Sequence, residues 1–408
     1  MIWLRSFLFA LIVALFGADA LAAPAAPPPP ITILISIDGF RPDYLERHAT
    51  PTLSRLAAGG VVAAMRPSFP SVTFPNHYTL VTGLRPDRNG MINNTMEDPA
   101  RPGVVFTINN RAVAGDPIWW NEATPIWISA ERQGVRAGTM YWPGSEYEIH
   151  GARPSRYRVF DQSMSSFARA DVLLSWLDAP VEQRPRFFTL YFDIVDSAGH
   201  HFGPDSLETT AAVAEVDAAI ARLLRGLDAR GYRNRVNYVI VADHGMTNVS
   251  PDRVVDLDAS APATAAHVVW DGPFAGLTPL GRHEADVEHA LLGRHDHGEC
   301  WRKGELPERF HYGANPRVPA IVCLADLGWV YHSTQMPPYP GSSAGNHGYD
   351  PAERDMAALF LAYGPAFRRG VQLPSFDNVS VYPLVARLIG VTPEPNDGDV
   401  ADTAAALR

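Results

Sequence analysis

Continuous apolar runs, each ending at an acidic or glycine-containing corner, recur along this chain and restrict the folds open to it. Residues 31–37 (ITILISI) form the first run, which ends at Asp38 and Gly39. A run rich in β-branched residues is typical of a strand buried on both faces of a parallel sheet. Comparable runs follow at residues 135–142, 187–194, 238–241 and 356–362.

Helical patterns separate these apolar runs. Residues 213–227 have apolar positions at spacings of three and four, and a shorter helix is expected to begin at Pro51 and to end near Gly59. Strands that alternate with helices predict an α/β fold with a mostly parallel central sheet flanked by helices. In such sheets, ligands bind in the crevice outside the carboxyl ends of the strands.

One long segment interrupts the alternation. Residues from about 251 to 345 are rich in proline, glycine, histidine and charged residues, and they contain no long apolar helix. We interpret this segment as an irregular insertion or cap within a single catalytic domain that spans residues 31–408.

The N-terminus has the organisation of a secretory signal peptide. One arginine precedes the nearly continuous apolar residues 6–17, and small residues follow as far as Ala23. We predict cleavage of residues 1–23, a stiff proline-rich spacer at 24–30, no membrane span in the mature chain, and a periplasmic or secreted location. The alternative is a retained N-terminal anchor.

In an exported protein, Cys300 and Cys323 are expected to form one disulfide.

Side chains that commonly bind metals follow three of the apolar runs, and one more, His347, lies shortly before the run at residues 356–362. They are Asp38, Asp196 and His200 in DSAGHH, Asp243 and His244 in DHG, and His347 in GNHGYD. Each alone has an ordinary structural explanation, such as a helix cap or a solvated loop. Together they would place uncompensated charge in one crevice, which is costly without cations. Oxygen and imidazole ligands favour zinc, with manganese or another divalent ion as the alternative.

Thr73 lies just before residues 77–82, which have the pattern of the first turns of a helix. The simplest interpretation of Thr73 is an ordinary N-cap, although a helix N-terminus also suits an anion. Two metal ions about 4 Å apart would clamp the attacking and leaving oxygens of a phosphoryl transfer. In that setting Thr73 becomes a candidate nucleophile, because a metal lowers the pKa of its hydroxyl.

The formal net charge of −10 argues against a basic nucleic-acid-binding surface. An acidic protein that acts on a phosphate compound needs a local source of positive charge. Metal ions are one such source.

Five segments, in this order, resemble the nucleotide pyrophosphatase/phosphodiesterase family of the alkaline phosphatase superfamily: IDGFRPDYL, PSFPSVTFPNHYTLVTGLRPDRNGMINN, YFDIVDSAGHHFGP, VADHGM and GNHGYD. The resemblance covers the catalytic domain, from about residue 31 to the C-terminus, and implies an alkaline-phosphatase-like fold. It implies two zinc ions, the first held by Asp38, Thr73, Asp243 and His244, and the second held by Asp196, His200 and His347. It also implies that Thr73 attacks phosphorus to give a phosphothreonine, which a water on the second zinc then hydrolyses.

The resemblance implies roles in substrate binding for four residues. Asn94 would donate a hydrogen bond to a phosphate oxygen, and its alternative role is a turn residue. Phe74 and Tyr157 would sandwich a nucleobase, and stacking of this kind contributes about 1–3 kcal/mol per base. The alternative for Tyr157 is a surface or core aromatic. Phe106 would add an apolar wall.

Other conspicuous residues are not assigned to the site. The sequence His295-Asp296-His297 is interpreted as a solvated loop of the insertion. His77 and His201 neighbour the motif ligands, but the resemblance gives neither a role in metal binding. The tryptophans at positions 119, 120 and 127 are expected to lie in the core.

The predicted function is hydrolysis of dinucleoside polyphosphates, nucleoside triphosphates and nucleotide diesters to nucleoside 5′-monophosphates such as AMP. An alkaline phosphomonoesterase is an alternative, but it would need an arginine for a dianion where the motif offers the neutral Asn94. A glycerophosphodiester or lipid-headgroup phosphodiesterase would use the aromatic residues for choline or lipid. A binding module without turnover is disfavoured by the complete ligand set together with Thr73.

Overall fold

The computed structural model describes residues 30–337 and 343–408, so the predicted signal peptide and nearly all of the spacer lie outside the described residues. An eight-stranded sheet forms the centre of the molecule, with the strand order β19-β2-β18-β8-β1-β7-β5-β6. Its strands are β1 (Ile31–Ile37), β2 (Val61–Met65), β5 (Ala137–Met140), β6 (Arg156–Tyr157), β7 (Phe187–Phe192), β8 (Val236–Val241), β18 (Ala358–Tyr363) and β19 (Val371–Gln372).

Most neighbours in this sheet are parallel. β1 pairs in parallel with both β7 and β8, whereas β18 runs antiparallel to β8 and to β2. Every residue of β1, β7 and β8 is buried, as expected for strands with helices on both faces. Each apolar run singled out in the sequence contains or overlaps a strand of the sheet, which confirms the predicted mostly parallel α/β fold.

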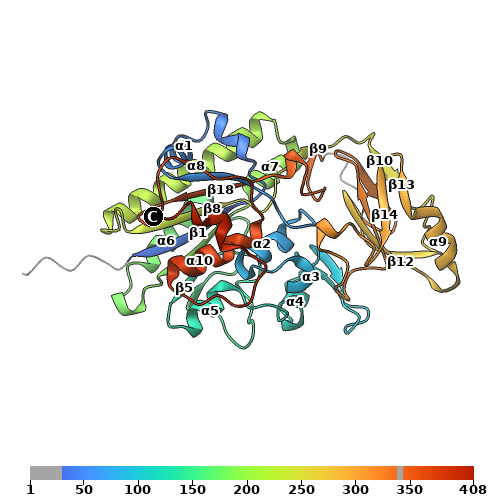
Figure 1. The fold of residues 1–408 in the computed structure, drawn as a ribbon, viewed down its shortest axis with the longest axis horizontal. Helices are drawn as coiled ribbons and strands as arrows, with labels where there is room; N and C mark the ends of the chain where they lie inside the picture. The colour runs from blue at the N-terminus through green and yellow to red at the C-terminus, as the bar shows by residue number, and fades with distance from the viewer. Residues whose placement is uncertain (1–29, 338–342) are drawn as a thin grey trace, which may run out of the picture.

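Helices cover both faces of the central sheet (Figure 1). One face carries α1 (Pro51–Gly59), α6 (Ser166–Trp176), α7 (Ile194–Phe202) and α8 (Leu207–Ala229), and the other carries α2 (Thr73–Thr82), α5 (Ile126–Arg132) and α10 (Val381–Ile389). Ser206 caps α8 by accepting a hydrogen bond from the backbone N–H of Thr209. Val213, Val216 and Ile220 belong to the buried stripe of α8, so the predicted amphipathic helix is confirmed.

The insertion folds into a second, smaller sheet at one end of the molecule (Figure 1). Its five strands, in the order β11-β12-β15-β14-β13, are antiparallel, and helix α9 (Glu284–Leu291) accompanies them. They are β11 (Ala266–Trp270), β12 (Phe274–Pro279), β13 (Gly293–His295), β14 (Gly298–Arg302) and β15 (Ile321–Ala325). The segment is therefore more regular than its composition indicated, because short antiparallel strands need few consecutive apolar residues. We call residues 251–345, where described, the cap.

A disulfide joins Cys300 and Cys323, which lie directly opposite each other on β14 and β15. This bond confirms the pairing expected from the sequence.

Within residues 30–337 and 343–408, no helix has both the length and the apolar character that a bilayer span requires.

The cap packs against the segment that leads into α2. The ring of Phe69 stacks on Phe310 and meets Phe274 and Tyr312 edge to face. The buried Arg317 of the cap donates hydrogen bonds to the Asp98 carboxylate and to the backbone carbonyls of Gly90 and Ile118. These contacts fix the cap against the loops that precede and follow α2.

Candidate active site

The carboxyl ends of three adjacent strands bring the predicted ligands together. Asp38 directly follows β1, Asp243 and His244 follow β8, and Asp196 lies in the first turn of α7, just after β7. Because β1 pairs with both β7 and β8, these three ends meet at one edge of the sheet. His347 follows the end of the cap, where β17 (Gly345–Asn346) pairs with β9 (Thr247–Asn248), shortly after His244.

The six side chains form two groups, in each of which the potential ligand atoms lie within 4.8 Å of one another. The first group, Asp38, Asp243 and His244, is here called the closed group, because its side chains are at most 2% exposed. The second, Asp196, His200 and His347, is called the open group, because its side chains are 17%, 34% and 7% exposed. The rings of His244 and His347 stack with centroids 3.6 Å apart and so join the two groups.

Three buried carboxylate oxygens in these groups have no hydrogen-bond partner. They are Asp38 Oδ1, Asp243 Oδ2 and Asp196 Oδ1, one from each aspartate. In the closed group, His244 Nε2 lies 3.0 Å from Asp243 Oδ2 and 3.5 Å from Asp38 Oδ1. Burial of a carboxylate oxygen without a partner is costly, and a divalent cation removes that cost. The residues therefore fit a metal ion.

The three histidines share one hydrogen-bonding arrangement. The Nδ1 atoms of His200, His244 and His347 each lie 2.9 Å from a backbone carbonyl oxygen, those of Gly345, Gly245 and Ser71 respectively. If Nδ1–H donates to the carbonyl, each Nε2 lone pair points into its group. An imidazole fixed in this way by a carbonyl is the usual form of a histidine that binds a metal. The Nε2 atoms of His200 and His347 lie 3.1 Å apart, so a shared cation would relieve their repulsion.

The pKa values of these groups shift in opposite directions. Burial and repulsion from Asp243 and Asp196 raise the pKa of Asp38 well above its usual range, although Tyr191 donates it a 2.6 Å hydrogen bond. Burial also disfavours ionisation of Asp243, but His244 and His77 together hold the pKa of its carboxyl well below the usual range. Burial and the neighbouring His244 and His200 lower the pKa of His347. Protein groups alone therefore leave the charges of this site poorly balanced.

Thr73 is the first residue of α2, and the residue in the N-cap position is Val72. The interpretation of Thr73 as an ordinary N-cap is therefore wrong, because the extended conformation of Val72 places the threonine one position inside the helix. The Thr73 hydroxyl instead lies 3.2 Å from His244 Nε2, next to the closed group. This hydroxyl is held beside the backbone N–H groups of a helix start, where an anion is also favoured.

Asn94 lies beside the same helix start. Its side-chain oxygen accepts a 2.9 Å hydrogen bond from the backbone N–H of Phe74, and the backbone N–H of Asn94 donates to the side-chain oxygen of Asn93. Because the Asn94 oxygen is engaged, its amide NH2 group is left to act as a donor.

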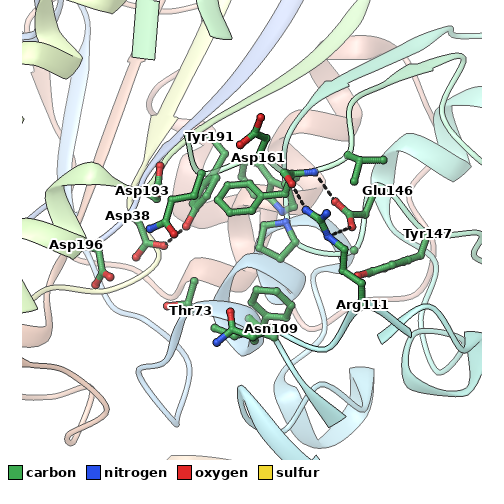
Figure 2. A pocket seen from close by; sticks show the side chains of 18 of the residues that line it. Asp38, Thr73, Asn109, Arg111, Glu146, Tyr147, Asp161, Tyr191, Asp193 and Asp196 are labelled. Atoms are coloured by element: carbon green, nitrogen blue, oxygen red, sulfur yellow. Dashed lines mark hydrogen bonds and ion pairs between the residues drawn. The ribbon is translucent and has the colours of Figure 1, made fainter. Parts of the chain in front are cut away.

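A cavity of about 800 Å3 extends from the edge of the sheet. Figure 2 shows Asp38, Thr73 and Asp196 at one end of this cavity and Arg111, Glu146 and Tyr147 at the other. The aromatic residues that line the cavity include Phe74, Trp142, Tyr147 and Phe160. A planar apolar group fits beside the candidate nucleophile.

Tyr157 does not line this cavity, contrary to the expected role in a nucleobase sandwich. It lies opposite Thr139 on the edge strand β6, is 39% exposed, and contacts Arg153. The chain enters the cavity only after β6 ends, so Phe160 takes the wall position. The sequence RYRVF offers two aromatics three residues apart, and nothing local distinguishes them.

Phe106 is fully buried and lies behind Phe74, with ring centroids 6.2 Å apart, rather than on the cavity wall. The predicted core tryptophans at 119, 120 and 127 are also fully buried. In the cap, the ring of His297 stacks on Trp329, and neither group of potential metal ligands among the described residues includes positions 295–297.

The sequence interpretation missed the polar far end of the cavity. Glu146 accepts a 2.7 Å hydrogen bond from the backbone N–H of Phe160, and Arg111 donates to the carbonyl oxygen of the same residue. Arg111 Nε lies 3.5 Å from Glu146 Oε1, so the two charges compensate each other (Figure 2). These residues come from segments without recognisable motifs, and only their convergence marks them.

The fold and this site define the class of alkaline-phosphatase-like hydrolases. Murine ectonucleotide pyrophosphatase/phosphodiesterase 5 superposes with a TM-score of 0.87 at 33% sequence identity, over 93% of this chain and 100% of the murine chain. The same relative has a structure of an inactive threonine-to-alanine variant in complex with AMP, with the same TM-score.

The sequence comparisons identify the family. The profile of the type I phosphodiesterase/nucleotide pyrophosphatase family matches residues 32–350. An uncharacterized pyrophosphatase/phosphodiesterase of Schizosaccharomyces pombe is 37% identical over 90% of this chain and 78% of its own length. A bis(5′-adenosyl)-triphosphatase of Xenopus laevis is 35% identical over 93% of this chain and 82% of its own. The chain belongs to the nucleotide pyrophosphatase/phosphodiesterase family of hydrolases.

The lengths of the relatives differ. Ectonucleotide pyrophosphatase/phosphodiesterase family member 3 of Bos taurus is 36% identical over 91% of this chain, but the match spans only 43% of the bovine protein.

Proposed function

We propose that the protein is a two-zinc phosphodiesterase and pyrophosphatase that hydrolyses nucleotides to nucleoside 5′-monophosphates through a phosphothreonine. One observation carries this proposal. The Thr73 hydroxyl lies 3.2 Å from His244, in a group with unpartnered buried carboxylate oxygens, at the end of an aromatic cavity.

The two groups would hold one zinc ion each. The closed group and Thr73 would hold the first, and the open group would hold the second. Their donor set of carboxylate oxygen and imidazole nitrogen suits zinc. When bound, the ions would supply the positive charge that stabilises the attacking and leaving oxygens of an in-line displacement.

The chain's own residues would perform the covalent step. The Thr73 oxygen forms a bond to phosphorus while the bond from phosphorus to the leaving alcohol or phosphate breaks. Water then cleaves the phosphothreonine, which releases the monophosphate and restores the hydroxyl. The amide NH2 of Asn94, placed beside the start of α2, would donate to a non-bridging phosphate oxygen.

The aromatic cavity would select a nucleotide. Phe74 and Phe160 are the proposed walls for the base, Phe160 replacing Tyr157, while Phe106 supports Phe74 from behind. Substrates of this shape include dinucleoside polyphosphates, nucleoside triphosphates and nucleotide diesters. The Xenopus relative is named for a diadenosine substrate, and the AMP complex of the murine relative supports an AMP-like product. The murine threonine-to-alanine variant is inactive, which supports a threonine nucleophile.

A phosphomonoesterase fits the site less well. A dianionic monoester would call for a cationic side chain near Thr73, whereas the cavity's Arg111 lies at the far end and pairs with Glu146. A monoanionic diester needs no cationic side chain beside Thr73, and its planar substituent would fit the aromatic part of the cavity.

We further propose that residues 31–408 form one catalytic domain in which 251–345 is a cap, and that the protein is exported to the periplasm or the medium. The disulfide supports an oxidising compartment, and the relatives named as ectonucleotide enzymes support an exported one.

Comparison of kcat/KM for three substrates tests the proposed function. The expected order places nucleotide p-nitrophenyl esters first, above both glycerophosphocholine and p-nitrophenyl phosphate. A preference for the phosphomonoester or for glycerophosphocholine would contradict the proposal.

A further inference from the structure

His77 is a fully buried histidine that belongs to neither group of candidate ligands. It lies one helical turn after Thr73 in α2, so its side chain is directed to the same side of the helix. The ring reaches the closed group from behind, between the helix that carries the candidate nucleophile and the carboxyl end of β1.

Each ring nitrogen of His77 has a defined neighbour. Nδ1 lies 2.9 Å from the backbone carbonyl oxygen of Thr73 and 3.2 Å from Asp243 Oδ2. Both neighbours are acceptors, so Nδ1 carries the hydrogen. Nε2 lies 2.8 Å from the hydroxyl of Ser36, near the end of β1, which donates to it in the neutral ring. The ring therefore touches three segments that form the site.

Aromatic neighbours hold the ring in this orientation. Trp142 and Tyr191 contact it edge to face, both with centroids 5.1 Å away. Trp142 also donates its indole N–H to the His77 carbonyl oxygen, and Tyr191 donates to Asp38 of the closed group. With both nitrogens engaged and two aromatic rings in contact, rotation of the ring would break several contacts at once.

Asp243 has three close neighbours, the backbone N–H of Gly39 and the rings of His244 and His77. Its Oδ1 accepts a 3.2 Å hydrogen bond from the backbone N–H of Gly39, whereas Oδ2 is the unpartnered oxygen that faces His77 and His244. If His244 binds a metal through Nε2, His77 Nδ1–H is the group left to orient Oδ2.

We propose that His77 is a positioning residue that orients the Asp243 carboxylate toward the metal of the closed group and fixes the first turn of α2, and hence Thr73, relative to it. This proposal rests on the proposed function. A histidine with a purely structural role would fill the same space, but it would influence the metal only through overall stability.

Two substitutions separate these roles. His77→Asn retains an amide donor close to the position of Nδ1, whereas His77→Gln retains a polar group near Nε2 and loses the Nδ1 donor. With zinc and a competing chelator, wild-type protein should bind two equivalents tightly. His77→Gln should bind one of them about 10–100-fold more weakly, the usual effect of losing an outer partner of a metal ligand. Its kcat on a nucleotide p-nitrophenyl ester should fall similarly while KM stays near the wild-type value, and His77→Asn should keep both zinc affinities.

His201→Gln is the matched control, because His201 adjoins His200 in sequence but contacts Phe202 instead of a ligand carboxylate. This variant should bind zinc like the wild type. Wild-type zinc affinity in His77→Gln would overturn the proposal. So would equal losses of affinity in His77→Asn and His77→Gln. If His77→Gln fails to fold, a loss of zinc affinity in folded His77→Asn would overturn the proposal, because this variant keeps a donor near the position of Nδ1. Failure of the wild type to hydrolyse nucleotides would contradict the proposed function, whereas a difference in zinc affinity between the two variants would still support the role of His77.

Discussion

The closed and open groups contain the same kinds of side chain but are built differently. The closed group comes entirely from the ends of two paired strands, β1 and β8, and its side chains are at most 2% exposed. The open group combines a helix, α7, with a histidine that directly follows the short β17–β9 pairing at the end of the cap. The sheet therefore fixes one group directly, whereas the other also depends on the β17–β9 pairing. We expect the first group to hold its metal more tightly and the second to exchange it more readily.

The largest effect is expected from Thr73→Ala, which separates the nucleophile from the ligands. Turnover should fall by about 1,000-fold or more, because the variant has no hydroxyl with which to form the phosphothreonine. Both groups should still bind zinc, because their carboxylates and imidazoles remain. Measurement of kcat and of zinc content checks this expectation. Unchanged turnover would remove Thr73 from the mechanism.

A matched pair, Asp243→Asn and Asp196→Asn, compares the groups directly. Asp243→Asn should cause the larger loss of kcat and of thermal stability, because the Asp243 side chain is fully buried and water has little access to replace the missing ligand. Asp196 is 17% exposed, so water can partly substitute for its oxygen. Metal analysis and thermal unfolding of both proteins provide the measurement. A greater effect at Asp196 would reverse the comparison.

Gradual removal of metal tests the order of release. A chelator should remove one zinc quickly from the open group and the second slowly from the closed group. Thermal stability should fall mainly in the slow phase, because a buried charge left unpaired costs about 3–5 kcal/mol. A chromophoric chelator followed over time, with unfolding measured at intervals, reports both steps. Simultaneous release of both ions would contradict the expected difference in metal exchange between the two groups. Activity that persists in metal-free protein would refute the metal mechanism.

The smallest effect concerns the cavity, which faces residues of both groups. Phe160→Ala should raise KM for a nucleotide p-nitrophenyl ester by roughly 5–150-fold, equivalent to the 1–3 kcal/mol of one stacked base. Zinc content should not change. Tyr157→Ala is the control, because this side chain lies on the edge strand outside the cavity. The reverse result, a large effect at Tyr157 and none at Phe160, would restore Tyr157 to the base site.

The sequence by itself determined the mostly parallel sheet and the membership of both groups. Strand runs such as residues 31–37 are local signals, and parallel strands necessarily bring their carboxyl ends to one edge. A ligand type placed directly after such a run, as with Asp38 or Asp243, is therefore assigned to the site before any long-range contact is known. The motif resemblance supplied the same residues independently, together with Thr73.

Only the tertiary structure decided how these residues are enclosed and which neighbours support them. It placed Thr73 inside α2 instead of at its cap, put Phe160 in the cavity where Tyr157 was expected, and brought His77 against Asp243. It also closed the far end of the cavity with Arg111 and Glu146. Side-chain direction at a strand edge, in a loop or behind a ligand depends on segments that are distant in sequence, and no local pattern in the chain encodes those contacts.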